Sequence, residues 1–485
     1  MGHDEYDVIV IGGGPAGENA AAYAIAGSDR TAVIVEHELV GGECSYWACM
    51  PSKALLAPGH LLDAARNLPG VAEIVGDSRL DVAAVLARRD SFTSHHDDAS
   101  QVKWAKQNGI DVLRGHGRIT GERTVEVRSG GQTRTLTASA AVVLATGTTA
   151  SVPDTEGLRD AVPWTSRDVT NMVEVPRRVV VVGGGVVAVE SATWLLQLGV
   201  EELTMVVRGP SLLESAEPFA GERVAATLRE RGARILCNAD LSRAERADAQ
   251  ATGEGHIHGG SAILTVDGES ITADEIVVAA GRRPASTDIG LDAVGLPVGK
   301  YVDTDDHLTV TGVDGDWLYA VGDINGRAPL THMGKYQARV AGDVIAARAT
   351  GTALDGSRFA ASADHGQVPQ VVFGAPEVAW VGRTEHVARA DGFDVDTVEA
   401  DIAVAGSSLA RDDYDGHAKL VIDKATDTLL GVTFVGPGVG ELIHAGTVAV
   451  VGKVPLQTLW HVVPSYPTIS EVWLRLLEAH REATR

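Results

Sequence analysis

Residues 7–17 read Asp-Val-Ile-Val-Ile-Gly-Gly-Gly-Pro-Ala-Gly. The apolar run predicts a buried strand, and the alanine-rich sequence after the glycines predicts a helix. In the pattern G-x-G-x-x-G, Gly12 allows a tight turn, Gly14 lets a pyrophosphate approach the backbone, and Gly17 lets the helix pack closely on the strand. The phosphates then lie at the helix N-terminus, where backbone N–H groups are free. The stretch therefore predicts a dinucleotide-binding unit.

The chain continues this pattern beyond the helix. Residues 31–35 (Thr-Ala-Val-Ile-Val) predict a second buried strand, and Glu36 follows it directly. An acid at the end of this strand accepts hydrogen bonds from the hydroxyls of a ribose. Strand, glycine turn, helix, strand and acid at this spacing are far more specific than the glycines alone.

The same pattern begins again further along the chain. A strand at 179–182 leads into Gly183-Gly184-Gly185-Val186-Val187-Ala188, in which alanine takes the place of the third glycine. Two fingerprints in one chain predict two bound dinucleotides. The next strand, 203–207, ends at Arg208 instead of an acid. Because an arginine at this point suits the 2′-phosphate of NADP, the sequence favours NADPH over NADH.

A pair of cysteines follows the first fingerprint. Residues 41–53 read Gly-Gly-Glu-Cys-Ser-Tyr-Trp-Ala-Cys-Met-Pro-Ser-Lys. In an undistorted helix, Cys44 and Cys49 would have Cα atoms about 8–9 Å apart. A disulfide needs a Cα separation of roughly 4.4–6.8 Å, so a bond between them requires an irregular turn. The spacing alone also describes two unrelated buried cysteines.

Taken together, these patterns resemble the flavin-dependent pyridine nucleotide–disulfide oxidoreductases, which include dihydrolipoamide dehydrogenase, glutathione reductase and mercuric reductase. The resemblance implies that Cys44 and Cys49 form a redox-active disulfide. Cys49 would be the charge-transfer thiolate next to the flavin, and Cys44 the interchange thiol that attacks the substrate. The implied fold is α/β, with two Rossmann-like dinucleotide-binding domains, for FAD and NAD(P), and a C-terminal α+β dimerisation domain. The implied boundaries are 1–150 for the first part of the FAD-binding domain, 151–284 for the NAD(P)-binding domain, 285–348 for the second part of the FAD-binding domain, and 349–485 for the dimerisation domain.

The resemblance also assigns residues to the two cofactors. Asp323, at the end of Leu318-Tyr319-Ala320-Val321-Gly322-Asp323, would hold the ribitol chain of FAD. Lys53 and Glu190 would pair near the flavin; the alternative is an ordinary surface ion pair. NADP-dependent members often carry a second arginine where this chain has Glu214. The residues expected to bind the cofactors are Gly12, Gly14, Gly17, Glu36, Lys53, Gly117, Gly147, Asp323, Gly183, Gly185, Ala188, Glu190, Arg208 and Gly281.

The chain departs from the family pattern near its C-terminus. The usual acid–base motif is His-Pro-Thr followed by Glu, whereas this chain has Tyr466-Pro467-Thr468 and Glu471. A phenol has an ordinary pKa of about 10, against about 6.5 for imidazole, so it is a poor base near neutrality. It can still donate a proton. In the family this motif reaches the disulfide of the partner subunit, which implies a homodimer with catalytic roles for Tyr466 and Glu471. His461 is an alternative imidazole.

Composition limits the remaining classes of function. A chain of 485 residues is too long for one core, and two to four domains are expected. The formal net charge of −24 argues against nucleic-acid and anionic-membrane partners. We expect a cytoplasmic protein, since we find no signal peptide and no apolar run of about 18–20 residues. Three cysteines are too few for a disulfide scaffold, and we expect Cys237 to be an inert, small apolar residue. We expect Trp104 to lie in the core. No metal site is expected.

The leading hypothesis is that NADPH reduces FAD, which reduces the Cys44–Cys49 disulfide, which in turn reduces a disulfide or another small two-electron acceptor. One alternative is oxidation of a dithiol with NAD⁺, as in dihydrolipoamide dehydrogenase; Tyr466 and Arg208 both count against it. Another is reduction of a quinone or a metal ion. The fourth hypothesis is a flavin-binding protein that does not turn over a substrate. The sequence does not identify the acceptor.

Overall fold

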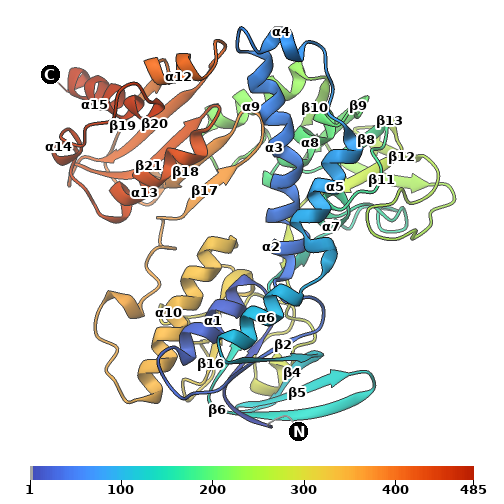
Figure 1. Ribbon diagram of the computed structural model, residues 1–485, viewed down its shortest axis with the longest axis vertical. Coiled ribbons are helices and arrows are strands. Elements are labelled where there is room, and N and C mark those ends of the chain that lie inside the picture. The colour runs from blue at the N-terminus through green and yellow to red at the C-terminus, as the bar shows by residue number, and fades with distance from the viewer. Residues whose placement is uncertain (1–3, 485) are drawn as a thin grey trace. The chain divides into compact units, whose positions relative to one another are not determined.

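The computed structural model describes residues 4–484, which divide into two compact units (Figure 1). Unit 1 comprises Met1–Pro51, Asp90–Ala150 and Arg282–Asp364. Unit 2 comprises Ser52–Arg89, Ser151–Gly281 and His365–Arg485. Each unit is thus assembled from three separate stretches of chain, and the division into four domain segments stays a prediction.

Unit 1 is built on one mixed sheet with the strand order β3-β2-β1-β6-β5-β4, and β16 also pairs with β6. Strands β1, β2, β3, β16 and the end of β6 pair in parallel, while β4 and β5 return as an antiparallel hairpin. The strands are β1 (Glu5–Ile11), β2 (Ala32–Glu36), β3 (Ile110–Arg114), β4 (His116–Gly121), β5 (Thr124–Ser129), β6 (Gln132–Leu144) and β16 (Leu318–Ala320). A separate pair consists of β7 (Thr148–Ala150) and β15 (Arg282–Pro284).

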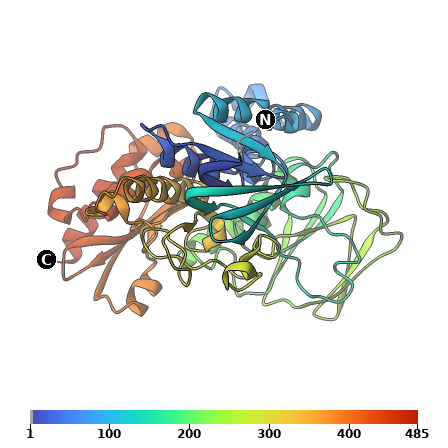
Figure 2. The ribbon, with the colours of Figure 1, turned by 90° about the horizontal axis from the view of Figure 1, so that it is seen from below.

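Helices cover one face of this sheet. Figures 1 and 2 show α1 (Pro15–Ile25) lying against α10 (Thr331–Ala349), and their alanines and valines form a buried cluster with one face of β1 and β2. The other face of the same strands packs against the β4–β5 hairpin and the segment 289–324. The remaining helices of this unit are α2 (Gly42–Tyr46), η1 (Ser94–His96), α6 (Ala99–Gln107), η2 (Leu291–Val294), η3 (Gly322–Asn325) and η4 (Ser357–Phe359), and α3 (Cys49–Arg66) begins here and continues into unit 2.

Unit 2 contains the second parallel sheet, with the order β10-β9-β8-β14, and a three-stranded antiparallel sheet, β11-β12-β13. The strands are β8 (Arg178–Val182), β9 (Glu202–Val207), β10 (Ala233–Cys237), β11 (Leu241–Arg246), β12 (Ala262–Val266), β13 (Glu269–Ala273) and β14 (Glu275–Val278). The other helices of this part of the unit are α4 (Ala72–Val75), α7 (Ser166–Thr170), α8 (Val186–Gln197) and α9 (Pro218–Glu230), together with most of α5 (Val82–Phe92).

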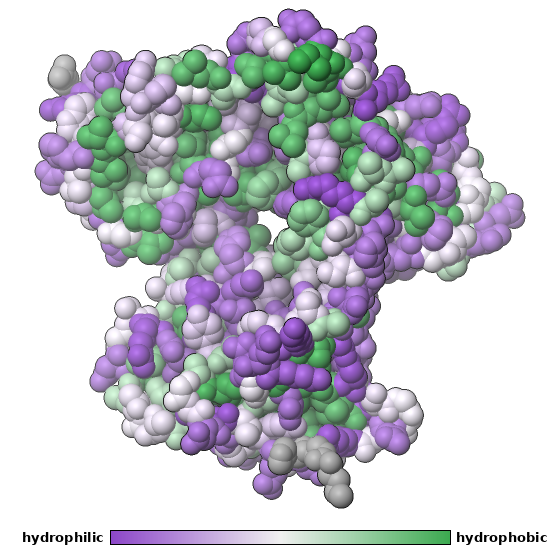
Figure 3. Space-filling view, viewed as in Figure 1, coloured by the Kyte–Doolittle hydropathy of each residue, from purple (hydrophilic) through white to green (hydrophobic). Residues whose placement is uncertain are grey.

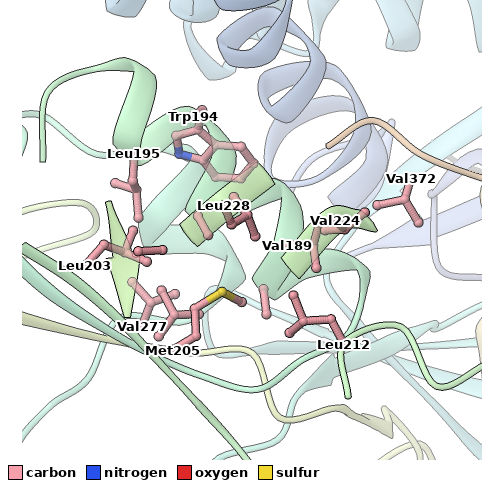
Figure 4. Packing of buried hydrophobic residues seen from close by; sticks show 14 of the residues in the cluster. Val189, Trp194, Leu195, Leu203, Met205, Leu212, Val224, Leu228, Val277 and Val372 are labelled. Atoms are coloured by element: carbon pink, nitrogen blue, oxygen red, sulfur yellow. The ribbon is translucent and has the colours of Figure 1, made fainter. Parts of the chain in front are cut away.

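A large apolar core joins this sheet to its helices. Figure 4 shows Val189 and Trp194 of α8, Met205 of β9 and Val224 of α9 packed together, with Val372 from the C-terminal region beside them. All five side chains are buried, so the nucleotide-binding sheet and the start of the C-terminal region share one core within unit 2.

The C-terminal region of unit 2 is a five-stranded antiparallel sheet with the order β17-β18-β21-β20-β19. Its strands are β17 (Pro369–Val372), β18 (Val378–Gly382), β19 (Val395–Asp401), β20 (His417–Asp423) and β21 (Thr428–Val435). Its helices are α11 (Glu385–Ala390), α12 (Ala405–Ala410), η5 (Val439–Glu441), α13 (Ile443–Val451), α14 (Leu456–Leu459), η6 (Ile469–Glu471) and α15 (Val472–Ala483). Apolar side chains remain on the surface of this region (Figure 3), and Val448, Val451, Val462 and Val463 are exposed.

One prediction about the core is wrong. Trp104 on α6 is 38% exposed, because the buried face of this short helix centres on Ala105. Among residues 4–484, no helix is both long and apolar enough to cross a membrane.

Candidate active site

The two cysteines lie on either side of a break in the helix. Helix α2 ends at Tyr46, Trp47 has a non-helical backbone, and α3 begins at Cys49. The irregular turn that a bond between Cys44 and Cys49 would require is therefore present. Both residues are thiols in this structure. Their mutual hydrogen bond, and secondly burial, raise the pKa of the Cys44 thiol.

The N-terminus of α10 meets this pair. Thr331, the first residue of α10, places its Oγ1 3.3 Å from the sulfur of Cys49. Thr331 and Lys335, one turn further along α10, both act to lower the pKa of Cys44, against the larger effect of Cys49. A hydroxyl donor at a helix N-terminus is a suitable partner for a thiolate.

A polar network includes Glu43 of α2, the helix that also contains Cys44. Arg282 pairs with the carboxylate of Glu43, the residue before Cys44, and its Nε donates to Thr148 Oγ1 at 2.6 Å. Thr148 in turn donates to Asp323 Oδ2 at 2.8 Å. Burial raises the pKa of Asp323, and the contacts with Thr148 and Arg282 oppose that rise. Of these four residues, only Asp323 was expected at the site from sequence.

The first glycine turn has the geometry that close packing requires. Gly12 has φ +104°, and a Cβ there would lie 2.4 Å from the carbonyl oxygen of Ala145. A Cβ on Gly17 would lie 2.0 Å from the carbonyl oxygen of Gly12, so α1 approaches β1 too closely for any side chain. At Gly14 the nearest atom to such a Cβ is 3.9 Å away, which leaves this side of the turn open to a phosphate group.

Glu36, the acid at the end of β2, is buried and hydrogen-bonded. Its carboxylate accepts hydrogen bonds from the N–H groups of Gly13 and Glu38, each at 2.7 Å, and lies 3.2 Å from Nδ1 of His37. Burial alone would raise the pKa of Glu36, but these hydrogen bonds outweigh it and lower the pKa. Gly117 packs against β1 and β2, and Gly147, with φ +72°, faces open space.

The second glycine turn in unit 2 repeats the first only in part. Gly183 has φ +136°, and its Cβ would lie 2.3 Å from the carbonyl oxygen of Ala279. Gly185 and Gly281 both face open space, while Ala188 is fully buried.

The end of β9 carries two opposite charges near this turn. Arg208 is exposed and has no hydrogen bond or ion pair with any residue in 4–484. The carboxylate of Glu214 lies over the next residue, since a Cβ on Gly209 would be 1.5 Å from Glu214 Oε1. A cation and a carboxylate thus both occur in the segment that follows β9.

The pair predicted between Lys53 and Glu190 is present in unit 2. Lys53 Nζ lies 2.8 Å from Glu190 Oε2, and the other carboxylate oxygen accepts from the backbone N–H of Phe373 at 3.0 Å. Lys53 also stands 4.9 Å from the centre of the Phe373 ring. Since the Glu190 side chain is only 5% exposed, this is not an ordinary surface ion pair. No sequence pattern identified Phe373.

The C-terminal acid–base candidates belong to unit 2. Tyr466 is 77% exposed and His461 is exposed, whereas Glu471 is buried. Among the described residues, Glu471 Oε2 has no hydrogen-bond partner, and Arg475 is 4.0 Å from the other oxygen. The roles of these residues stay predictions.

The fold and the site define a class of flavoproteins with two dinucleotide sites and a cysteine pair. Residues 6–338 match the pyridine nucleotide-disulphide oxidoreductase family, and residues 368–477 match the dimerisation domain of the same family. The chain therefore belongs to this family, as the resemblance predicted, and the predicted fold class is confirmed.

Several members of this family are similar to the chain. A mercuric reductase of Staphylococcus aureus is 28% identical over 96% of this chain and 81% of its own length. A dihydrolipoyl dehydrogenase of Chlorobaculum tepidum is 30% identical over 96% of this chain and 95% of its own. The solved Cu(II) complex of the HOCl-induced flavoprotein disulfide reductase RclA from Escherichia coli shares the fold, with a TM-score of 0.82 at 21% identity, over 98% of this chain and 99% of its own.

These findings establish the general activity. The chain is a flavin-dependent NAD(P)H disulfide oxidoreductase, which confirms the predicted class of enzyme. FAD and a nicotinamide nucleotide are the cofactors of the family, and the dimerisation domain indicates a homodimer.

Proposed function

We propose that this enzyme uses NADPH to reduce a small disulfide, with Cys44 as the thiol that attacks the substrate. The cysteine pair is the main support for this proposal, because Cys49 lies against Thr331 at the start of α10 and its hydrogen bond with Cys44 raises the pKa of the Cys44 thiol. This asymmetry gives the two sulfurs different tasks. Cys49 holds negative charge, and Cys44 exchanges with the substrate.

The residues of unit 1 suit FAD. The open side of Gly14 and the N–H groups at the start of α1 would receive the pyrophosphate, Glu36 the adenosine ribose, and Asp323 the ribitol. FAD, when bound, takes a hydride equivalent from the nicotinamide and passes two electrons to the disulfide. In unit 2, Lys53 and Glu190 form a rigid charged pair that would orient the groups bound beside it.

The thiol chemistry proceeds in two exchanges. The Cys44 thiolate attacks one sulfur of the substrate, forms a mixed disulfide and releases the first product as a thiolate. The Cys49 thiolate then attacks Cys44, re-forms the Cys44–Cys49 bond and releases the second product thiolate. Two protons complete the two product thiols, and two electrons have passed from the cysteine pair to the substrate.

Arg208 supports the choice of NADPH. An exposed guanidinium without a partner among residues 4–484 is available to a 2′-phosphate. Glu214 opposes this choice, because its carboxylate lies over the adjacent Gly209 and would repel a phosphate. The variant Glu214→Gln is therefore expected to lower KM for NADPH while leaving KM for NADH nearly unchanged.

We assign the acid–base role across the subunit interface to Tyr466 and Glu471. An exposed Tyr466 close to the exposed apolar residues Val462 and Val463 is consistent with a surface that a second subunit covers. A phenol donates a proton to a departing thiolate more readily than it removes one from a dithiol. This favours disulfide reduction over dihydrolipoamide oxidation, although a dihydrolipoyl dehydrogenase is a similar protein.

The cysteine assignment has a direct spectroscopic test. Two-electron reduction of the purified holoenzyme should give a long-wavelength absorption band from a thiolate beside the flavin. Cys49→Ser should abolish this band, and Cys44→Ser should show it without any reductant. If both variants absorb like the wild type before and after reduction, the redox role of the pair is wrong.

Residue 466 has a test of its own. Tyr466→His should raise dihydrolipoamide oxidation at pH 7, because imidazole is a better base there than phenol. Tyr466→Phe should slow turnover with the true acceptor, found by screening oxidised thiols, quinones and metal ions against the NADPH-reduced enzyme. Rapid wild-type oxidation of dihydrolipoamide near pH 7 would contradict the assignment.

A further inference from the structure

The break between α2 and α3 is present without a disulfide to impose it. Cys44 and Cys49 are thiols, yet Trp47 keeps the non-helical backbone that separates the two helices. Only Trp47 and Ala48 lie between these helices, and alanine strongly favours a helix. A helical course through both residues would also pair backbone groups that the break leaves at the two helix ends. Other contacts in unit 1 therefore hold the break.

Three aromatic rings pack together at the break. The ring centroids of Tyr46 and Trp47 are 5.6 Å apart, and the ring of His96 lies 5.4 Å from Trp47 and 5.9 Å from Tyr46. Tyr46 and Trp47 are buried, and His96 is half-buried. We call these three residues the ring cluster. Because the direction of a side chain follows its backbone conformation, a helical Trp47 would point its ring away from this position. The ring cluster and a continuous helix therefore exclude each other.

His96 reaches the ring cluster from a strained turn. Ser94, His95 and His96 have φ of 49°, 51° and 58°. Residues other than glycine seldom adopt this left-handed conformation, and rarely in succession. The N–H of His96 donates to the carbonyl oxygen of Thr93 at 2.9 Å, which closes the turn. Such strain persists only where the surrounding structure fixes it, and it is concentrated at functional sites. Here the strained turn brings the imidazole ring onto Trp47.

The same segment also contacts the chain before the cysteines. Two residues after His96, the buried Asp98 accepts a hydrogen bond from the backbone N–H of Val40 at 2.7 Å. The segment thus holds the chain on both sides of Cys44, at Val40 through Asp98 and at Trp47 through His96. These contacts fix the backbone around Cys44 whether or not the two sulfurs are bonded.

We infer that the ring cluster holds the helix break in the dithiol state and thereby makes the Cys44–Cys49 pair a stronger reductant. This inference rests on the proposed disulfide exchange. Oxidation of the pair joins the two sulfurs and releases two electrons and two protons. In turnover these pass to the substrate disulfide, whose S–S bond breaks to give two thiols.

The direction of the effect follows from the geometry that each state needs. The disulfide requires the break, because a continuous helix would place the Cα atoms of Cys44 and Cys49 about 8–9 Å apart. The dithiol has no such requirement, so without the ring cluster it can relax towards a helix. That relaxation would stabilise the dithiol alone. Since the ring cluster prevents it, the ring cluster lowers the reduction potential of the pair. His96 is then a positioning residue that acts through Trp47.

The test measures the reduction potential rather than turnover. The holoenzyme is equilibrated without oxygen in mixtures of reduced and oxidised dithiothreitol, and free thiols are trapped with N-ethylmaleimide. Mass spectrometry of the peptides gives the fraction of Cys44 and Cys49 that is labelled at each ratio. His96→Ala should raise the equilibrium constant for reduction of the disulfide at least about tenfold, or about 30 mV in potential.

Three further variants separate this role from a general structural one. His95→Ala removes an exposed histidine of the same turn and should change the constant less than about twofold. His96→Phe keeps a ring on Trp47 and should stay within about threefold of the wild type. Trp47→Ala removes the ring cluster from the other side, should shift the constant in the same direction as His96→Ala, and decides the question if His96→Ala does not fold. FAD content and melting temperature are compared in parallel.

The outcomes distinguish this inference from the proposed function. If His96→Ala and Trp47→Ala both stay within about twofold of His95→Ala, the ring cluster does not set the potential, and the disulfide chemistry stands. A shift in the opposite direction, or a His96→Phe variant that behaves like His96→Ala, would also contradict the inference. If the wild type forms no Cys44–Cys49 disulfide at any ratio, the proposed function itself fails, and the inference fails with it.

Discussion

The two dinucleotide sites share the backbone geometry of their first glycine turn but carry different side chains around it. At the first glycine of each site, Gly12 and Gly183 have positive φ, and a Cβ would come within 2.4 Å and 2.3 Å of a carbonyl oxygen. Both turns are therefore equally dependent on glycine at this point. Two strand–turn–helix units with the same tight turn thus lie in separate units of one chain.

The sites differ in the third position of the fingerprint and at the end of the next strand. Gly17 leaves no room for a side chain, whereas Ala188 fits. Glu36 is buried under three hydrogen-bonding groups, whereas Arg208 is exposed and without a partner among residues 4–484. The first site has its polar groups fixed in advance, which suits a cofactor that stays bound. The second site has an exposed arginine at the corresponding position.

The largest expected effect breaks the tight packing of the first site. Gly17→Ala places a Cβ 2.0 Å from the Gly12 carbonyl oxygen, so α1 must move away from β1. We expect a loss of about 3 kcal/mol or more in the free energy of unfolding, and weaker FAD binding. Urea denaturation and flavin content per chain measure these effects. Near-normal stability would mean that the close approach is not rigid.

The second prediction concerns an acid in the first turn of the helix that follows the glycine turn, which α1 has and α8 lacks. Helix α1 has Glu18 in its first turn, and α8 has no acid there. Because the pKa of Glu18 is raised in the folded state, the wild type should lose stability as pH rises from about 4.5 to 7, and should not regain it above. Relative to wild type, Glu18→Gln should therefore be more stable at pH 8 than at pH 4, by on the order of 3 kcal/mol.

Urea denaturation at both pH values checks this, with Glu122→Gln as the control for an exposed glutamate. An equal difference between variant and wild type at the two pH values would show that Glu18 has an ordinary proton affinity.

The third prediction concerns the free charge of the second site. Arg208→Glu should weaken NADPH binding by about 1.5–3 kcal/mol, because a charge-assisted contact with the 2′-phosphate is lost, and should spare NADH. Arg229→Glu, an exposed change of the same charge on α9, separates this contact from a general charge effect. Titration with both nucleotides measures it, and equal losses with NADPH and NADH would remove Arg208 from the 2′-phosphate site.

The smallest effect tests the tolerance of the second site. Ala188→Gly restores the third glycine in α8, and we expect a loss of about 1–2 kcal/mol in unfolding free energy from lower helix propensity and lost burial. The nucleotide affinities should stay within about twofold of the wild type. A larger change in affinity would show that Ala188 does more than pack.

The sequence predicted those features whose residues are close together in the chain. Both glycine turns, Glu36 and the helix break between Cys44 and Cys49 followed from local spacing. The Lys53–Glu190 pair came from the family resemblance, since these residues are far apart in the sequence.

Other features depended on contacts that no local pattern reports. Glu43, Thr148 and Arg282 form one network although they come from three separate segments of unit 1. The burial of Glu18 was not predicted, because an acid in the first turn of a helix is common and usually faces solvent. Trp104 was misassigned because its helix is short and buries a neighbouring alanine instead.

The contact between Cys49 and Thr331 also has a consequence during synthesis, because 282 positions separate the two residues. At about 5–20 residues per second, a ribosome needs roughly 15–60 s to reach Thr331 after Cys49. Arg282 and Asp323 are also made long after the cysteines. Throughout that interval, the nascent chain presents both thiols without the helix that later adjoins them. The pair can therefore be oxidised before α10 has been synthesised. The reducing conditions in the cell then determine whether unit 1 folds with both cysteines as thiols.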